Sequence, residues 1–338
     1  MYCPKCGKEN PDDAQLCHLC SSILTSTPAQ VQALGVKTSG MAIAALILGI
    51  LSFFTLGLTA IPAIILGIIS LVIIEKSGGR LTGRGFAIGG IVAPVILVPI
   101  FLMIILMPAL QRVKRQARVI ACQSNLNQWS LIFSMYTQDN NGYFFSSEGR
   151  DNGRLWMDTL RPYYRNNNKL FLCPAATKPY TEGGQNPFGA WTTPEGDSGS
   201  YGLNGWACNP KQGQTELRRR GPIEDYWRTP KVQVVNNIPL FLDALWVNAW
   251  PRSSDEPPEY ENWRKNKFGL NEMRCFCTNR HNGFVNGLFM DSSVRKVGLK
   301  ELWTLKWHRQ FDTKGPWTRA GGVQPSDWPP WMRNFRDY

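Results

Sequence analysis

The sequence lacks charged residues over two long stretches, 41–74 and 86–107. The second stretch has 22 residues, which as a helix measure about 33 Å at about 1.5 Å per residue. This length crosses the hydrocarbon core of a bilayer, so 86–107 is predicted to be a transmembrane helix. Pro94 and Pro99 fall inside it, which lipid tolerates because neighbouring helices satisfy the carbonyls that proline leaves free.

The stretch 41–74 is too long to be a single membrane span. Its 34 residues would make a helix of about 51 Å, well beyond a bilayer even with tilt. Two spans, 41–56 and 60–74, with a turn near 55–62, fit better. Together with the stretch 86–107 they predict three transmembrane helices. The repeated LGI and the later GRGFAIGGI resemble a small bacterial membrane-hairpin family of unknown function.

We expect no secretory signal peptide, because the first 22 residues are polar and rich in cysteine. Cys3-x2-Cys6 and Cys17-x2-Cys20 are separated by ten residues, the spacing with which two knuckles place four thiolates around one zinc ion. Two disulfides or free thiols are the alternatives.

The segment 1–22 looks like the short zinc ribbon at the N-terminus of many bacterial membrane proteins. So short a piece cannot bury a core, so the metal would supply its folding energy. Gly7 allows the tight turn after Cys6, and Ser21 stands where the ribbon family commonly has glycine. His18 is expected to be an exposed turn residue outside the ligand set.

Tryptophan is absent before residue 129, so the aromatic part of the chain is C-terminal. Beyond Arg118, apolar residues recur in steps of three and four, as on one helical face. This stripe is Val119, Cys122, Leu126, Trp129, Phe133 and Tyr136. We expect one long helix to join the membrane to a globular domain that covers the stripe.

Residues 108–144, PALQRVKRQARVIACQSNLNQWSLIFSMYTQDNNGYF, resemble the N-terminal helix of type IV pilins and type II secretion pseudopilins. They are closest to a pseudopilin-like subfamily with the pattern ARxxxCxSNLxQ. The resemblance continues through W-x3-L-x-P-Y, Phe-x-Cys-Pro, Ser-Tyr-x-x-Asn and Phe-x-Asp-Ala segments to a His-x9-Asp-Gly signature. Here His281 and Asp291 are in register, but Ser292 replaces the glycine, which puts the following turn in doubt. The resemblance implies an α+β fold, in which the long helix packs on a small antiparallel β-sheet.

From 139 onward the segments are short, aromatic and interrupted by Gly, Pro and Asn, as in antiparallel strands joined by long loops. The expected elements are 155–176, 198–210, 238–251 and the strand 284–290. The tail contains Trp303, Trp307, Trp317, Trp328 and Trp331, which could stack sugars or a partner, but such residues more often seal a small domain.

No nucleophile elbow, phosphate loop or His-Glu-x-x-His pattern occurs in the sequence. His281, Asp243 and Asp291 could form a catalytic or metal constellation, with Ser292 or Ser293 as a nucleophile. We favour the simpler interpretation that His281 and Asp291 flank a strand and bind turn backbone, and we expect no enzyme. Calcium binding stays open, since no loop has a distinctive spacing of oxygen ligands.

Five cysteines lie in the C-terminal part, namely Cys122, Cys173, Cys208, Cys275 and Cys277. Cys275 and Cys277 point to one face if they lie in a strand, and either could pair with Cys208. Cys122 could pair with Cys173. Because the number is odd, one thiol is left over.

The net charge is +12, but only one dense basic cluster occurs: Arg112, Lys114, Arg115 and Arg118. It follows the third span directly and is predicted to meet lipid headgroups, so no nucleic-acid partner is expected. Flanking positive charges do not decide the orientation. Zinc thiolates survive best in a reducing compartment, and pilin-like domains face outward, so we expect a cytoplasmic N-terminus in a bacterial inner membrane.

The predicted organisation is a zinc ribbon at 1–22, a linker at 23–40, a membrane anchor at 41–107 and a pilin-like extracytoplasmic domain at 108–338. The predicted function is that of a non-enzymatic, membrane-anchored pseudopilin-like protein, with secretion-system or pilin-like proteins as possible partners. The alternative is a membrane sensor or adaptor whose outer domain binds a ligand such as a glycan. Gly85-Phe86 mimics a prepilin cleavage junction, but the fifth residue after it is Gly90, where pilins have glutamate, so processing is not expected.

Overall fold

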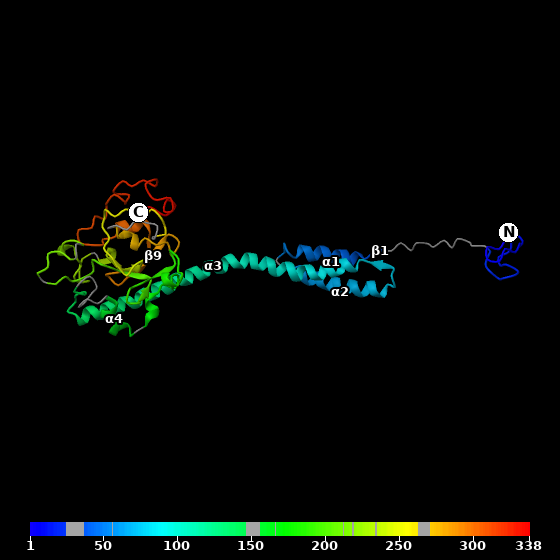
Figure 1. Cartoon of the computed structure of the whole chain (residues 1–338), viewed down its shortest axis with the longest axis horizontal. Helices are drawn as coiled ribbons and strands as arrows, with labels where there is room; N and C mark the ends of the chain where they lie inside the picture. Colours follow the sequence, from blue (N-terminus) through cyan, green and yellow to red (C-terminus); the bar gives the residue numbers. More distant parts are fainter. Residues whose placement is uncertain are drawn as a thin grey trace. The chain divides into compact units, whose positions relative to one another are not determined.

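The chain forms two compact units, Met1–Ala109 and Leu110–Tyr338, in a computed structural model (Figure 1). The structure describes residues 1–24, 37–55, 57–146, 156–165, 167–211, 213–217, 220–233, 235–262 and 271–338. Most of the predicted linker 23–40 lies outside these ranges. The boundary between the units falls inside helix α3, Arg84–Asp139, which contributes to both.

The first unit begins with two small loops, each closed by one antiparallel bridge, Tyr2↔Glu9 and Leu16↔Ile23. Three helices follow residue 39: α1 (Gly40–Leu51), α2 (Ala60–Lys76) and the first half of α3. Two-residue strands β1 (Lys37–Thr38) and β2 (Leu81–Thr82) pair in parallel beside them.

Helix α3 is the one helix, among the described residues, that is long and apolar enough to cross a membrane. Helix α1 has 12 residues and α2 has 17, about 18 Å and 26 Å. The expected three full spans are therefore not supported, and the first helix ends five residues before the predicted limit of 56. Two carbonyls in the last turn of this helix accept hydrogen bonds from hydroxyl groups. The Ser52 hydroxyl donates to Gly49 O at 2.6 Å, and the Thr59 hydroxyl donates to Leu48 O at 3.1 Å.

Small residues let the helices of this unit approach closely. A Cβ on Gly90 of α3 would lie 2.6–2.9 Å from Ala45 of α1, and one on Gly49 would lie 2.9 Å from the carbonyl of Gly90. On α2, a Cβ on Gly67 would lie 3.0 Å from the carbonyl of Ala87. Only glycine permits these backbone approaches, a packing mode typical of membrane helices.

The second unit is built around the C-terminal half of α3. The predicted stripe faces inward: Cys122, Leu126 and Trp129 are fully buried, and the other three residues are at most 9% exposed. The Trp129 ring lies 5.2 Å from that of Phe241, in the central strand of the larger sheet. The long helix therefore supplies one layer of the core, and the sheet supplies the other.

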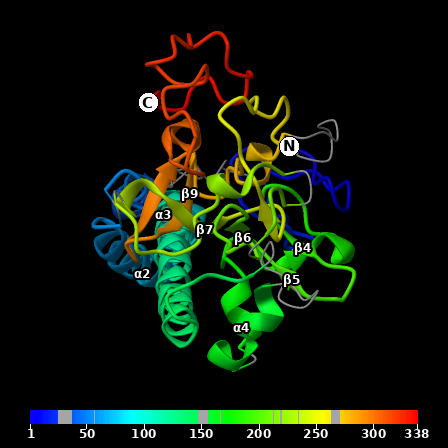
Figure 2. The same ribbon diagram turned by 90° about the vertical axis from the view of Figure 1, so that its left-hand side faces the viewer.

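The larger sheet has five strands in the order β10-β9-β7-β6-β8, three of which are labelled in Figure 2. They are β6 (Tyr201–Asn204), β7 (Pro239–Asp243), β8 (Asn248–Ala249), β9 (Phe284–Phe289) and β10 (Val294–Gly298). All neighbouring pairs are antiparallel except β6 and β8. The predicted α+β fold with a small sheet is therefore right, with one parallel pair added.

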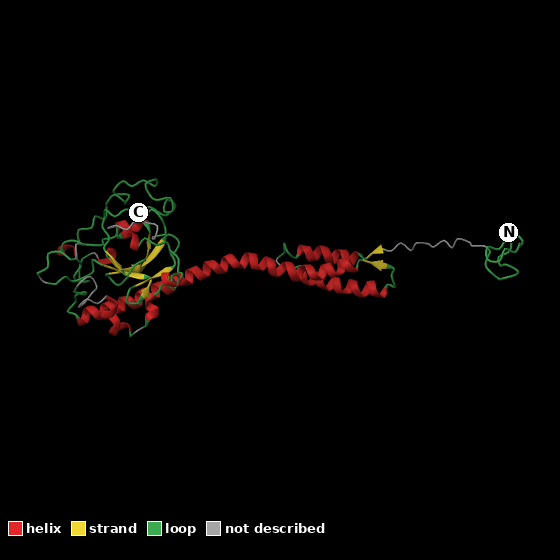
Figure 3. Ribbon diagram, viewed as in Figure 1, coloured by secondary structure: helices red, strands yellow, loops and turns green. Residues whose placement is uncertain are grey.

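A smaller sheet and several short helices complete this unit, and loops form much of it (Figure 3). The smaller sheet has the order β3-β4-β5: β3 (Lys178–Pro179), β4 (Gly189–Thr192) and β5 (Ser198–Gly199). The short helices are α4 (Trp156–Tyr164), η1 (Asn168–Phe171), η2 (Tyr180–Glu182), η3 (Ile223–Asp225), η4 (Val235–Asn237), η6 (Met273–Cys275) and η7 (Lys300–Thr304).

The expectation of strands in 155–176 is wrong for the described residues, which contain α4 and η1. In α4, Trp156, Met157, Leu160 and Tyr164 are buried at helical spacing. In the C-terminal tail, Trp303, Trp307 and Trp328 are at most 2% exposed, and the Trp303 and Trp328 rings meet at 5.4 Å. These three side chains therefore seal the domain, as we expected.

Candidate metal centres

The four N-terminal cysteines come together at one point. Their sulfur atoms all lie within 4.8 Å of one another, with Cys3 and Cys20 3.6 Å apart and Cys6 and Cys17 3.5 Å apart. A tetrahedral ion with metal–sulfur bonds of about 2.3 Å holds its sulfur ligands about 3.8 Å apart. This four-cysteine cluster therefore has the size and the donor set of a metal site.

Two matching turns build the four-cysteine cluster. The N–H of Gly7 donates to the carbonyl of Cys3, and the N–H of Ser21 donates to that of Cys17, both at 2.9 Å. Gly7 has φ +70° and Ser21 has φ +54°, so both turns need a left-handed residue. Serine occupies that conformation at a cost that glycine avoids.

Polar groups surround the sulfurs. The Ser22 hydroxyl lies 3.1 Å from the sulfurs of both Cys3 and Cys20, and its hydrogen bond lowers the pKa of Cys3 to about 6. The Asn10 amide lies 3.6 Å from the Cys17 sulfur and accepts a hydrogen bond from the His18 N–H. The His18 side chain is exposed and outside the ligand set.

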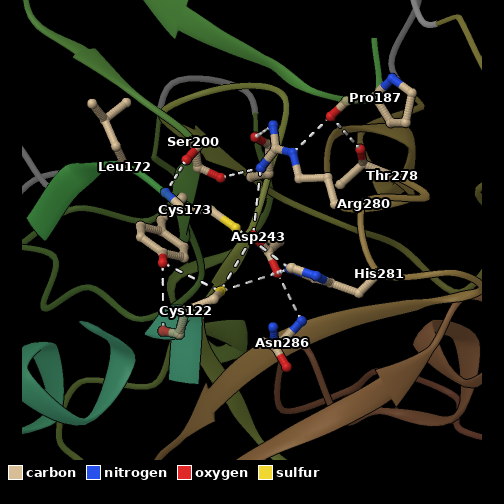
Figure 4. A network of polar contacts seen from close by, with 12 residues as sticks. Cys122, Leu172, Cys173, Pro187, Ser200, Asp243, Thr278, Arg280, His281 and Asn286 are labelled. Carbon is tan, nitrogen blue, oxygen red and sulfur yellow. Dashed lines mark hydrogen bonds and ion pairs between the residues drawn. The ribbon is translucent and has the colours of Figure 1, made fainter. Parts of the chain in front are cut away.

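The second unit brings together residues that are far apart in sequence (Figure 4). Asp243 ends β7, His281 precedes β9, Cys122 lies in α3 and Cys173 follows η1, and one potential ligand atom from each lies within 4.8 Å of the other three. Three of these residues are 0% exposed, and His281 is 8% exposed. We call these four residues the head cluster.

The polar contacts of the head cluster converge on its centre. His281 Nε2 lies 3.2 Å from Asp243 Oδ2 and 3.4 Å from Cys173 Sγ. Cys122 Sγ lies 3.7 Å from both carboxylate oxygens. The Tyr201 hydroxyl donates to Cys122 Sγ at 3.2 Å.

Burial and neighbouring charges shift the pKa values of the residues in this cluster. Burial opposes ionisation, but the attraction between His281 and Asp243 outweighs it, so the pKa of Asp243 lies below its ordinary value and that of His281 rises to about 10. Burial raises the pKa of the Cys122 thiol. For Cys173, hydrogen bonds with Cys122 and His281 outweigh burial and lower the pKa to about 7.

The local backbone explains why His281 reaches the cluster. Asn282 and Gly283 follow it with φ values of +57° and +88°, and the Asn279 side chain accepts the Gly283 N–H at 2.6 Å. Two successive left-handed residues turn the chain sharply into β9. The histidine is therefore held inward, and the expectation that it binds turn backbone is wrong.

The other candidate catalytic residues lie elsewhere. Asp291 is exposed in the β9–β10 turn and accepts hydrogen bonds from the Ser293 N–H at 3.0 Å and hydroxyl at 2.6 Å. Ser292 adopts φ +68°, so the turn forms although serine replaces glycine. Asp291, Ser292 and Ser293 therefore form a turn and do not join His281.

Sequence reasoning paired Cys122 with Cys173 but did not place either beside Asp243 and His281. The sequence did contain a signal for this cluster. The resemblance rests on four segments that each contribute one residue of the head cluster, namely ACQSN, FLCP, FLDA and HNG. All nine cysteines are described, and none forms a disulfide. Cys277 instead contacts the Met332 sulfur at 4.0 Å.

Residues 41–106 match the family described as "Domain of unknown function (DUF4190)". The match coincides with the stretch that the sequence predicts to be the membrane anchor, and it leaves the ribbon and the second unit uncovered. No curated protein and no solved structure matches the chain.

Proposed function

We propose that this protein is a non-enzymatic membrane component that displays a pseudopilin-like head and carries a cytoplasmic zinc ribbon. One observation carries the proposal: a single helix, α3, has an apolar, largely exposed first half and a second half with one face buried under a small sheet. A helix with these two halves anchors a domain to a bilayer. Secretion-system or pilin-like proteins are the partners that the resemblance implies.

The exposed apolar surface of the first unit supports placing all three helices in lipid. Side chains such as Ile47 of α1, Ile65 of α2 and Met103 of α3 are 51–66% exposed. Water would disfavour so much apolar surface, whereas lipid would cover it. Helices α1 and α2 are short for full spans, and local thinning of the bilayer would accommodate them beside α3.

The packing around Gly90 supports a chain that keeps its N-terminal part. Position 90 is where pilins have the glutamate that follows their cleavage site. In this chain Gly90 lies so close to Ala45 that even a Cβ atom on residue 90 would clash. Because α1 precedes Gly85-Phe86, cleavage there would separate two helices that pack together, so the chain acts as a fixed anchor.

The basic residues at the start of the second unit support a contact with lipid headgroups. Arg112, Arg115 and Arg118 of α3 line one groove of about 640 Å³ together with Lys296 of β10. Clustered cations next to a membrane helix attract anionic headgroups by about 1 kcal/mol each. This groove also suits the alternative function, a membrane sensor or adaptor whose outer domain binds a ligand such as a glycan, if that glycan is acidic.

Stacking of glycans on Trp303, Trp307 and Trp328 is disfavoured by their burial. A direct test uses the full-length protein reconstituted in nanodiscs and a set of neutral and acidic oligosaccharides. Binding that disappears when Arg112→Ser and Arg115→Ser are combined would favour the sensor, with Arg319→Ser as the exposed control. No binding, together with in-cell crosslinks to pilin-like or secretion proteins, would support the structural role.

The topology is tested by single exposed cysteines on the two units. With an impermeant maleimide and intact spheroplasts, Glu182→Cys in the head should be labelled, whereas Asp13→Cys in the ribbon should react only after permeabilisation. Both positions are exposed, and the unchanged protein, whose Cys6 is itself exposed, gives the background labelling for both variants. The reverse pattern would reverse the proposed orientation.

A further inference from the structure

The four ligand atoms of the head cluster all lie within 4.8 Å of one another, close enough for one ion to contact all of them. A tetrahedral zinc ion with Zn–S bonds of about 2.3 Å and Zn–N or Zn–O bonds of about 2.1 Å holds its ligands about 3.4–3.8 Å apart. The observed separations are 3.2 Å for His281 Nε2 to Asp243 Oδ2, 3.4 Å for His281 Nε2 to Cys173 Sγ and 3.7 Å for Cys122 Sγ to either carboxylate oxygen. We propose that Cys122, Cys173, Asp243 and His281 bind one structural zinc ion in the core of the head.

The geometry differs from that of a cysteine nucleophile activated by histidine and aspartate. In such a triad the two ring nitrogens have different partners, one the nucleophile and the other the carboxylate. Here Cys173 and Asp243 both approach Nε2. Convergence on one nitrogen is what a shared ion requires, and a buried thiol offers no access to a substrate.

A divalent cation would balance the charges around the cluster. Two thiolates and one carboxylate carry three negative charges, and the buried Arg280 guanidinium, 3.6 Å from Asp243, supplies one positive charge. A divalent ion with neutral His281 makes the sum zero.

A second layer of hydrogen bonds holds the ligands in place, as around known metal sites. Arg280 donates to the carbonyls of Pro187 at 2.8 Å, Gly189 at 3.0 Å and Ala244 at 2.8 Å, and also to that of Ser200. The N–H of Asn286 donates to Asp243 Oδ2 at 2.8 Å. With four protein ligands the site has no open position, so its role is structural. Cys122 and Cys173 are 0% exposed, and buried thiols are inert to oxidants, so this site does not need the reducing compartment that is expected for the ribbon.

The test counts metal in the full-length protein purified in detergent. We expect two zinc ions per chain, and X-ray absorption averaging three sulfur and one nitrogen or oxygen ligand per zinc. Replacing all four ribbon cysteines by serine should leave one zinc ion, bound by two sulfur and two nitrogen or oxygen atoms. Adding Cys122→Ser and Cys173→Ser should remove it, whereas adding Cys277→Ser, a buried control, should not.

The measurement on the unchanged protein keeps the test decisive even where a variant fails to fold. One zinc ion per chain with four sulfur ligands would overturn the proposal. An intact mass two hydrogens lower, mapped to a Cys122–Cys173 disulfide, would overturn it as well.

Discussion

The ribbon and the head each gather four potential ligands, but they do so in opposite ways. In the ribbon, two Cys-x2-Cys pairs within 20 residues supply all four, and two hydrogen-bonded turns aim them. In the head, the ligands come from segments up to 159 residues apart, Cys122 to His281, and a packed helix and sheet aim them. Local geometry can be read from spacing, whereas geometry set by tertiary packing cannot.

This difference predicts opposite dependence on the metal, and it gives the largest expected effect. The first 24 residues have no buried core, so removing the metal should unfold them with a loss on the order of 10 kcal/mol, the binding energy of a structural zinc ion. The head should remain folded, because its aromatic core persists. Hydrogen exchange of the full-length protein after chelation measures both regions at once.

The control for this experiment is His18→Ala. Because the His18 side chain is exposed, this substitution should leave the protection of the ribbon's amides from hydrogen exchange unchanged. Cys6→Ser should abolish that protection without chelator. Slow exchange of residues 1–24 in excess chelator would show that the ribbon folds without metal.

A second prediction concerns the charges in the head. Asp243→Asn keeps the shape of the side chain but leaves Arg280 without a buried partner, which should destabilise the head by about 3–5 kcal/mol. Denaturant unfolding, followed by the fluorescence of the head's tryptophans, measures this. Asp291→Asn is the matched control and should change stability by less than about 0.5 kcal/mol. Equal effects of the two substitutions would mean that the cluster stabilises nothing.

A third prediction concerns the close contact between helices α1 and α3 in the first unit. Gly90→Leu forces a side chain into the backbone of α1 and should destabilise the helix bundle by about 1–3 kcal/mol. Gly85→Leu, where a Cβ meets nothing within 4 Å, should be neutral. Resistance of the membrane-embedded protein to detergent-induced unfolding provides the measurement, and equal resistance would contradict the close contact.

The smallest effects are expected at the two serines with left-handed backbone. Ser21→Gly and Ser292→Gly should each stabilise their turn by about 0.5–1 kcal/mol, because glycine adopts positive φ without steric cost. Ser293→Gly, next to Ser292, should instead destabilise by about 1 kcal/mol, since the hydroxyl bound to Asp291 is lost. Thermal unfolding compares Ser292→Gly with Ser293→Gly, and a loss of stability in both would show that the turn is not strained at Ser292.

The features that were predicted correctly from the sequence are those encoded by a short motif or by a regular spacing of residues. The buried stripe of α3 followed from steps of three and four, and the four-cysteine cluster followed from its spacing. Helix α4 was missed because aromatic residues and Pro162 suggested strands, although Trp156, Leu160 and Tyr164 have helical spacing. The head cluster depends on the register of β7 against β9 and on the turn at Asn282, which no local pattern encodes.

The central claim is that one uncleaved chain carries both the ribbon and the head, joined through α3. Intact-mass spectrometry of the protein purified from native membranes tests it directly. The account predicts a single species that contains residues 1–24 together with the head through Tyr338. A mature species that begins at Phe86 would contradict it and would identify the chain as a processed pilin-like subunit.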